Sequence, residues 1–89
     1  MPTKDEVREQ LARLINEIAR VPLKSITDEA TVDNQLQMES VAFVELQVAI
    51  EDEYQIEIDP IRVVELNQFG AIVDYVYDCA VSGGNGALH

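Results

Sequence analysis

The stretch that decides the fold is residues 40–54, SVAFVELQVAIEDEY. Successive side chains of an α-helix are turned by about 100°, so apolar residues three or four apart share a face. Such a face is present here, and it is wide enough to cover a small core; it consists of Phe43, Leu46, Ile50 and Tyr54. We therefore predict a helix over about residues 40–54 that packs against the rest of the chain.

The same stretch carries a second apolar stripe on roughly the opposite side. This stripe consists of Val41, Val44 and Val48, and acidic residues lie beside it: Glu45, Glu51 and Asp52. A surface helix normally has one apolar face. Two interpretations are open: the helix is central and buried on both sides, or the valines and their acidic rim form an exposed docking patch.

A second helix is predicted near the amino terminus. Residues 3–6, Thr-Lys-Asp-Glu, have the pattern of a capping box. The helix is expected to end before Pro22, because proline disfavours helical geometry in the residue before it. Its apolar residues recur at helical spacing: Val7, Leu11, Leu14, Ile15 and Ile18.

Two further helices follow residue 54. Asp59-Pro60 is typical of an N-cap followed by proline at the first helical position. A short helix should therefore run to about Leu66, and Asn67 should cap a last one. The last helix has one apolar face, made of Phe69, Ile72, Val73, Val76 and Ala80.

The predicted fold is thus all-α: a small four-helix bundle of three longer helices and one short one. Residues 1–81 should form a single domain, and 82–89, with three glycines, a flexible tail. The irregular segment 21–39 is long, and loops of that length are uncommon unless they are functional or packed. Four apolar residues could hold it on the core: Leu23, Ile26, Val32 and Leu36.

The charge is strongly acidic, with 17 Asp and Glu against 6 Lys and Arg and a net charge of −11. This balance argues against DNA, RNA and anionic lipid as partners, because each requires a basic surface. No basic residue lies between Ser25 and Ile61, so a partner with Lys and Arg patches is expected.

The start at Met1 and the absence of a signal or membrane segment suggest a stand-alone, cytoplasmic protein, which we expect to be a monomer.

The usual parts of an enzyme are missing. The sequence has no internal histidine, no Gly-x-Ser-x-Gly turn, no glycine-rich phosphate loop and no His-Glu-x-x-His motif. Residues 28–39 are acidic at both ends like a calcium loop, but Ala30 and Val32 stand where ligands are required. Cys79 is the single cysteine, which excludes an internal disulfide. We expect no catalytic residue and no metal site.

Ser40 precedes the central helix and, by itself, is an ordinary helix cap. Its surroundings are more specific: the segments LQMESV (36–41), VEL (44–46), AIE (49–51), EY (53–54), IEI (56–58) and the later run from Phe69 to Val76. In this order and spacing, they resemble the acyl carrier protein family over about residues 4–78.

The resemblance implies that Ser40 carries 4'-phosphopantetheine as a phosphodiester, which a phosphopantetheinyl transferase installs from coenzyme A. Acyl intermediates of fatty acid or polyketide biosynthesis would travel on the arm as thioesters. Partners would be an acyl- or adenylate-forming ligase and downstream acyl-transferring enzymes. They would dock on the valines and acids of the central helix, which are Val41, Val44, Glu45, Val48, Glu51 and Asp52.

Two residues depart from the family pattern. Glu39 stands where the family has Asp, and Val41 where it has Leu. Glu39 keeps the carboxylate that assists modification but moves it by one methylene. No Gly-Gly pair precedes Ser40, which favours an acyl carrier, and residues 59–67 resemble free-standing carriers that work with adenylate-forming ligases. Two alternatives are open: an unmodified, carrier-like acidic adaptor, or an aminoacyl or peptidyl carrier.

Overall fold

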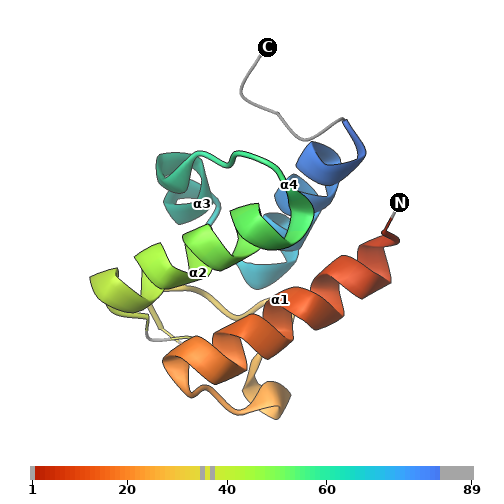
Figure 1. Cartoon of the computed structure of the whole chain (residues 1–89). Coiled ribbons are helices and arrows are strands. Elements are labelled where there is room, and N and C mark those ends of the chain that lie inside the picture. Colours follow the sequence, from red (N-terminus) through yellow and green to blue (C-terminus); the bar gives the residue numbers. More distant parts are fainter. Residues whose placement is uncertain (1, 35, 37, 83–89) are drawn as a thin grey trace.

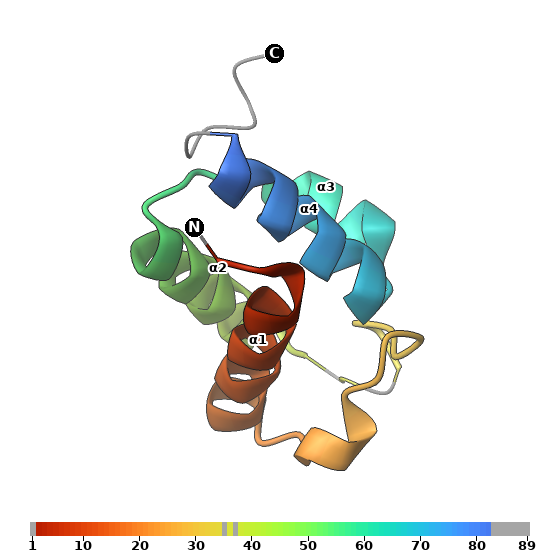
Figure 2. The same cartoon turned by 90° about the vertical axis from the view of Figure 1, so that its right-hand side faces the viewer.

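The computed structural model of the chain describes residues 2–34, 36 and 38–82. This part of the chain forms four α-helices, shown in Figures 1 and 2: α1 (Lys4–Ala19), α2 (Ser40–Tyr54), α3 (Pro60–Leu66) and α4 (Phe69–Val81). A short 3-10 helix, η1 (Leu23–Ser25), lies between α1 and α2. The described residues contain no strand, only one isolated bridge between Thr31 and Gln68. The all-α class and the helix ranges predicted from the sequence are therefore confirmed.

Helix α1 begins with the predicted capping box. The Thr3 hydroxyl accepts a hydrogen bond from the Glu6 N–H at 3.1 Å, and the Glu6 carboxylate accepts one from the Thr3 N–H at 2.8 Å. The helix ends at Arg20, which adopts the left-handed conformation with φ of 61°. Between these ends, one face is buried, formed by Val7, Leu11 and Ile15.

One core lies between the helices. α1 packs against both α2 and α4, and α3 packs against α4. Each of the four α-helices contributes a buried residue, and so does the loop before α2. The largest fully buried side chains are Phe69, Leu11, Leu36, Ile50, Val7, Val73 and Val76. Cys79 is buried as well, as expected for a packed thiol. The core therefore fixes how α2 is turned, which decides the face that it presents to solvent.

The loop between α1 and α2 is bonded to the start of α4. The N–H groups of Phe69 and Gly70 donate to the carbonyls of Ala30 and Asp28, at 2.8 and 2.9 Å. The first N–H groups of a helix have no acceptor within the helix, so carbonyl oxygens of the loop serve as their acceptors. A side chain at Gly70 would meet the Asp28 Cβ at 3.0 Å and its carbonyl oxygen at 3.2 Å. Only glycine permits this close approach.

This contact corrects the predicted cap of the last helix. The N-cap residue of α4 is Gln68, and its side chain makes no capping hydrogen bond. Asn67 instead ends α3, with φ of 64°, and its side-chain oxygen accepts a hydrogen bond from the Val32 N–H at 3.2 Å. The prediction was wrong by one residue because backbone carbonyls of a distant loop cap the helix.

The same loop buries most of its apolar side chains. Ile26 and Leu36 lie in the core, and Val32 is half-buried. Leu23 does not follow the prediction, since 58% of its surface is exposed. It lies at the start of η1, and the buried positions on either side of that turn are taken by Val21 and Ile26. Residues 83–89 of the predicted tail lie outside the described residues.

Candidate functional site

Ser40 is the first residue of α2, and its side chain is exposed. The residue in the N-cap position is Glu39, with extended φ and ψ of −77° and 165°, so the prediction that Ser40 itself caps the helix was wrong by one residue. The Glu39 carbonyl accepts the first helical hydrogen bond, from the Phe43 N–H at 2.8 Å. Among the described residues, the Ser40 hydroxyl has no hydrogen-bond partner. It is therefore available for reaction.

The backbone around this hydroxyl favours an anion. Because the Phe43 N–H is the first to be bonded within the helix, the N–H groups of Ser40, Val41 and Ala42 have no intrahelical acceptor. These groups also form the positive end of the helix dipole, and phosphates bind readily at such ends. A phosphodiester on Ser40 is thus compatible with the residues that surround it.

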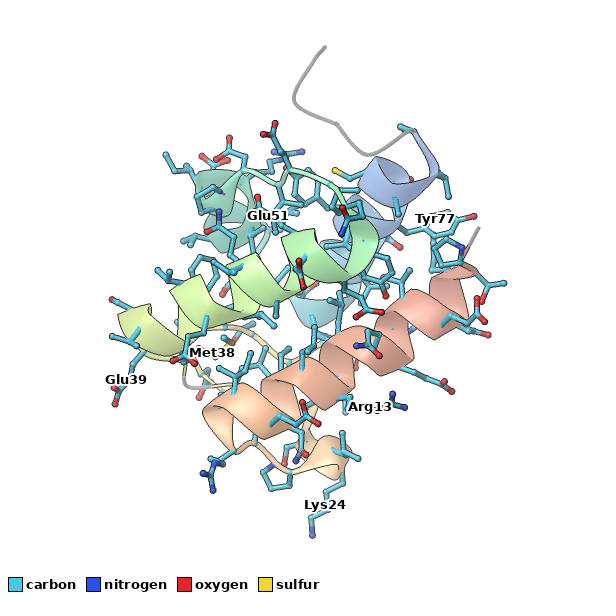
Figure 3. The ribbon with its side chains drawn as sticks, in the orientation of Figure 1. Arg13, Lys24, Met38, Glu39, Glu51 and Tyr77 are labelled. Atoms are coloured by element: carbon cyan, nitrogen blue, oxygen red, sulfur yellow. The ribbon has the colours of Figure 1, made fainter. Side chains whose placement is uncertain are left out.

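A shallow groove adjoins Ser40. It lies between the loop, α2 and α3, and its walls are Val32, Met38, Ser40, Phe43, Val44 and Val64. Figure 3 shows Met38, which lines the groove, and Glu39 at the amino-terminal end of α2. With the exception of Ser40, every residue of the walls is apolar.

The second stripe of α2 is exposed. Val41, Val44 and Val48 expose 70, 56 and 58% of their surface, whereas Leu46 and Ile50, on the other side of the helix, expose 6 and 2%. Of the two interpretations of this helix, the structure therefore favours an outward-facing apolar stripe. Helix α3 also exposes apolar side chains, since Ile61 and Val64 are 67 and 55% exposed, and Val64 lines the same groove as Val44. These two residues were not predicted from the sequence as part of an exposed surface, although their spacing of three was a usable signal.

The acidic residues beside the valines have no cationic partner within the described part of the chain. The salt bridges there join Lys4 to Asp74, Arg8 to Asp5 and Asp28, and Arg62 to Glu65, and none involves α2. Glu45 and Asp52 are exposed and rim a groove between α1 and α2. Its apolar wall consists of Ile18, Val44, Val48 and Ala49. This combination of apolar floor and acidic rim matches a Lys or Arg side chain with its aliphatic stem.

Glu51 differs from the other acids of α2. It is partly buried, and its carboxylate accepts a hydrogen bond from the Ile58 N–H at 3.0 Å. The Tyr75 hydroxyl accepts another from the neighbouring Asp59 N–H at 2.9 Å. Together, these bonds hold the link between α2 and α3. Glu51 thus has a structural role that its sequence position did not indicate. Figure 3 shows it far along α2 from Glu39.

Within residues 2–34, 36 and 38–82, no three His, Cys, Asp or Glu side chains are placed to hold a metal ion. None of the helices in that part combines the length and the apolar composition that crossing a membrane requires.

Comparison with known proteins agrees with the geometry of this site. Residues 9–76 match the family described as "Phosphopantetheine attachment site". The acyl carrier protein of Acidothermus cellulolyticus is 32% identical over 80 residues, which are 90% of this chain and 95% of that protein. The meromycolate extension acyl carrier protein of Mycolicibacterium smegmatis is 28% identical over 74 residues, covering 83% and 75%. A solved acyl carrier protein structure from Enterococcus faecalis has a TM-score of 0.71 at 26% identity, covering 86% and 98%.

The fold and these matches define a phosphopantetheine-bearing carrier domain: the chain belongs to the acyl carrier protein family. Its prosthetic group is covalently attached 4'-phosphopantetheine. Members of this family are carriers that work with biosynthetic enzymes and a phosphopantetheinyl transferase. The match to the attachment family argues against the alternative of an unmodified adaptor.

Proposed function

We propose that the prosthetic arm is attached at Ser40 and that the chain carries acyl groups on it as thioesters for biosynthetic enzymes. The observation that supports this most directly is the exposed Ser40 hydroxyl, which has no partner among the described residues and lies within the matched range 9–76. Ser25 is the one other serine in that range, and it is half-buried in η1. Ser40 is therefore the better acceptor.

The chain and the arm have separate roles in this scheme. The arm supplies the thiol, so the chain requires no nucleophile for acyl transfer. In the modification step, the Ser40 oxygen would bond to the phosphorus of coenzyme A that bears pantetheine. The pyrophosphate bond breaks, 3',5'-ADP leaves with the bridging oxygen, and the transferase takes the hydroxyl proton. The N–H groups at the start of α2 would then stabilise the phosphodiester. Glu39, exposed in the N-cap position, would assist the transferase through its carboxylate.

Intact mass measurement tests the attachment site. Incubation with coenzyme A and a broad-specificity phosphopantetheinyl transferase should add the mass of one arm. Ser40→Ala should abolish the gain, whereas the matched control Ser25→Ala should keep it. Glu39→Asp, which restores the family residue, should be modified at least as fast as the wild-type chain. A full gain in the Ser40→Ala variant, or none in the wild type with several transferases, would contradict the proposal.

We further propose that partner enzymes dock on Val41, Val44, Val48, Glu45, Glu51 and Asp52. The exposure of the valines supports this, and so do Glu45 and Asp52, which form no salt bridge with any described residue. Since Glu51 already bonds the Ile58 N–H, we expect it to contribute less than the other two acids. A partner with Lys or Arg side chains around an apolar residue would be guided by charge. A small contact of this kind also permits the rapid release that a shuttle between enzymes requires.

Two substitutions on opposite faces of α2 test the docking surface. Val44→Asp should impair acyl transfer to or from a partner enzyme, while the free energy of unfolding changes by no more than about 0.5 kcal/mol. Leu46→Ala, on the buried face, should instead cost about 2–5 kcal/mol. Urea denaturation and partner-dependent transfer assays measure both effects. Unfolding of the Val44→Asp variant, or full transfer by it, would contradict the assignment.

The nature of the cargo stays a prediction. Acyl, aminoacyl and peptidyl loads attach to the arm through the same thioester, so the docking face does not distinguish them. The monomeric state and the cytoplasmic location expected from the sequence stay predictions as well. Identification of the enzyme that loads the arm would decide the cargo.

A further inference from the structure

The groove between α1 and α2 has a volume of about 480 Å³, against about 260 Å³ for the groove beside Ser40. Figure 1 shows the two helices that form it lying side by side. The groove is open to solvent, whereas sites for small molecules usually bury about 70–90% of the ligand's surface. A segment of another protein, laid over the groove, is the occupant that would cover it.

The charged residues at the rim of this groove have a regular spacing. Glu45 and Asp52 both line it, are exposed and form no salt bridge with any described residue. They lie seven positions apart on α2, which is two turns or about 10.5 Å along the helix. Two cationic side chains, one for each carboxylate, match this rim better than a single one.

The floor between the two carboxylates is apolar. Val48 and Ala49 lie between them on α2, and Ile18 of α1, which is half-buried, forms the opposite wall. The burial of Val48 by a partner would remove apolar surface from water, because 58% of its surface is exposed. The groove therefore offers a site for an apolar side chain between two sites for cations.

A helix that lies along the groove would repeat this spacing. Residues seven apart on an α-helix share a face to within about 20°, and residues three or four after the first lie between them on that face. Lys or Arg at the two outer positions would meet Glu45 and Asp52, and their aliphatic stems would cover the neighbouring valines. An apolar side chain at the middle position would cover Val48 and Ala49. Amphipathic helices bind apolar grooves in this way.

A second copy of this chain does not meet the requirement. Basic residues seven apart occur once in the sequence, at Arg13 and Arg20. The positions between them that require an apolar side chain are Asn16 and Glu17, and Glu17 would be repelled by the acidic rim. The net charge of −11 opposes self-association as well. The occupant is therefore a different protein.

We propose that the groove between α1 and α2 binds an amphipathic helix of a partner enzyme. This helix has two basic residues seven positions apart and an apolar residue between them. The inference rests on the proposed docking surface and specifies its partner. It adds Ile18 of α1 to that surface, and it places the partner helix on the α1 side of α2, whereas Val64 lines the groove on the α3 side.

NMR on the intact holo-protein tests this with a designed peptide. The probe is a short helix, cross-linked to keep it helical, with Lys at the two outer positions and Leu between them. Its addition should shift the methyl signals of Ile18, Val48 and Ala49 and leave those of Ile61 and Val64 unchanged. A peptide with Ser in place of Leu, and one with the two lysines five positions apart, should bind more weakly.

A pair of double variants tests the role of the rim. Glu45→Gln/Asp52→Asn should weaken binding of the probe about three- to tenfold, the combined effect of two exposed ion pairs. Glu29→Gln/Glu57→Gln is the matched control, because it removes the same charge from exposed residues that do not line the groove. Its affinity for the probe should stay close to that of the wild type. Equal weakening in the two variants would overturn the proposal, since net charge alone would then explain binding.

The outcomes separate this inference from the docking surface itself. If the Val44→Asp variant transfers acyl groups normally, the docking surface is wrong. If that variant is impaired but the probe shifts Val64 and not Ile18, or does not bind, the partner helix is wrong and the docking surface stands. Association of the chain with itself in sedimentation analysis, reversed by Arg13→Gln, would make a second copy the occupant and would also overturn the proposal.

Discussion

At the scale of single residues, two side chains hold the link that precedes α3. Glu51 and Tyr75 each accept a hydrogen bond from the backbone, at Ile58 and Asp59 respectively. Asp59 in turn caps α3 by accepting from the Ile61 N–H at 2.9 Å. The position of α3, and with it Val64 in the groove, therefore depends on groups from α2 and α4.

The tyrosines predict a loss of stability in alkali. The pKa of Tyr75 is raised above its ordinary value of 10.0, mainly because the phenol is partly buried; the hydrogen bond from the Asp59 N–H opposes this shift. The pKa of Tyr54 is raised as well, first by burial and then by the negative charge of nearby Glu53. The folded state thus holds these protons more tightly than the unfolded state. The stabilisation that these two protonated tyrosines contribute is fully present below pH 10. It is lost as the pH rises through their raised pKa values.

Urea denaturation across this pH range measures the effect. The wild-type free energy of unfolding should fall more steeply above pH 10 than that of the double variant Tyr54→Phe/Tyr75→Phe, which has neither phenol. Equal slopes would contradict the prediction. At neutral pH, Tyr75→Phe removes the acceptor of the Asp59 N–H and should cost about 1 kcal/mol.

At the scale of elements, the loop between α1 and α2 behaves as part of the core. It covers the start of α4 with backbone carbonyls and buries Ile26, Ala30 and Leu36. The loop ends at Ser40, so its packing also places the amino-terminal end of α2. The described residues of this irregular segment are therefore held in place by tertiary contacts.

Two leucines of this loop provide a matched pair. Leu36 is 0% exposed and Leu23 is 58% exposed. Leu36→Ala should lower the free energy of unfolding by about 2–5 kcal/mol, because it removes buried methyl groups and leaves a cavity. Leu23→Ala should change it by no more than about 0.5 kcal/mol. Chemical denaturation measures both values, and similar losses for the two variants would show that the loop does not pack as described.

At the scale of the whole molecule, charge is distributed unevenly. Five of the six basic residues lie between Lys4 and Lys24, and Lys4 and Arg8 form salt bridges there. The ranges of α2 and α3 contain Arg62 as their single basic residue. The uncompensated carboxylates favour basic partners at the docking face but repel one another within the folded chain.

This repulsion makes stability dependent on salt. At about 0.01 M salt the screening length is about 30 Å, and at about 0.1 M it is about 10 Å. The molecule measures 31 × 24 × 20 Å, so carboxylates across its width repel at the lower concentration and are screened at the higher one. The melting temperature should therefore rise with sodium chloride over this range. The exposed salt bridges oppose this trend weakly, since such pairs contribute about 0–1 kcal/mol each.

Calorimetry at matched pH measures the change in melting temperature. An uncharged solute at equal osmolality serves as the control, because it does not screen charge. A melting temperature that stays constant or falls with added salt would show that attraction outweighs repulsion in this fold.

The sequence by itself determined the four helices and the family. The starts of α1 and α3 are set by local features, the Thr3–Glu6 capping box and Asp59-Pro60, and the faces of the helices by spacing along the chain. The pattern around Ser40 was sufficient to indicate the family. These features were predictable because each depends on residues within a few positions of one another.

Only the tertiary structure decided which stripe of α2 faces outward, since both stripes are apolar and the choice depends on α1, which packs against α2. The cap of α4, the bond from Ile58 to Glu51 and the groove that joins Val44 to Val64 also depend on residues far apart in the chain. Spacing along a helix tells which residues share a face. Burial of that face depends on what packs against it, and the packing forms only when the whole chain folds.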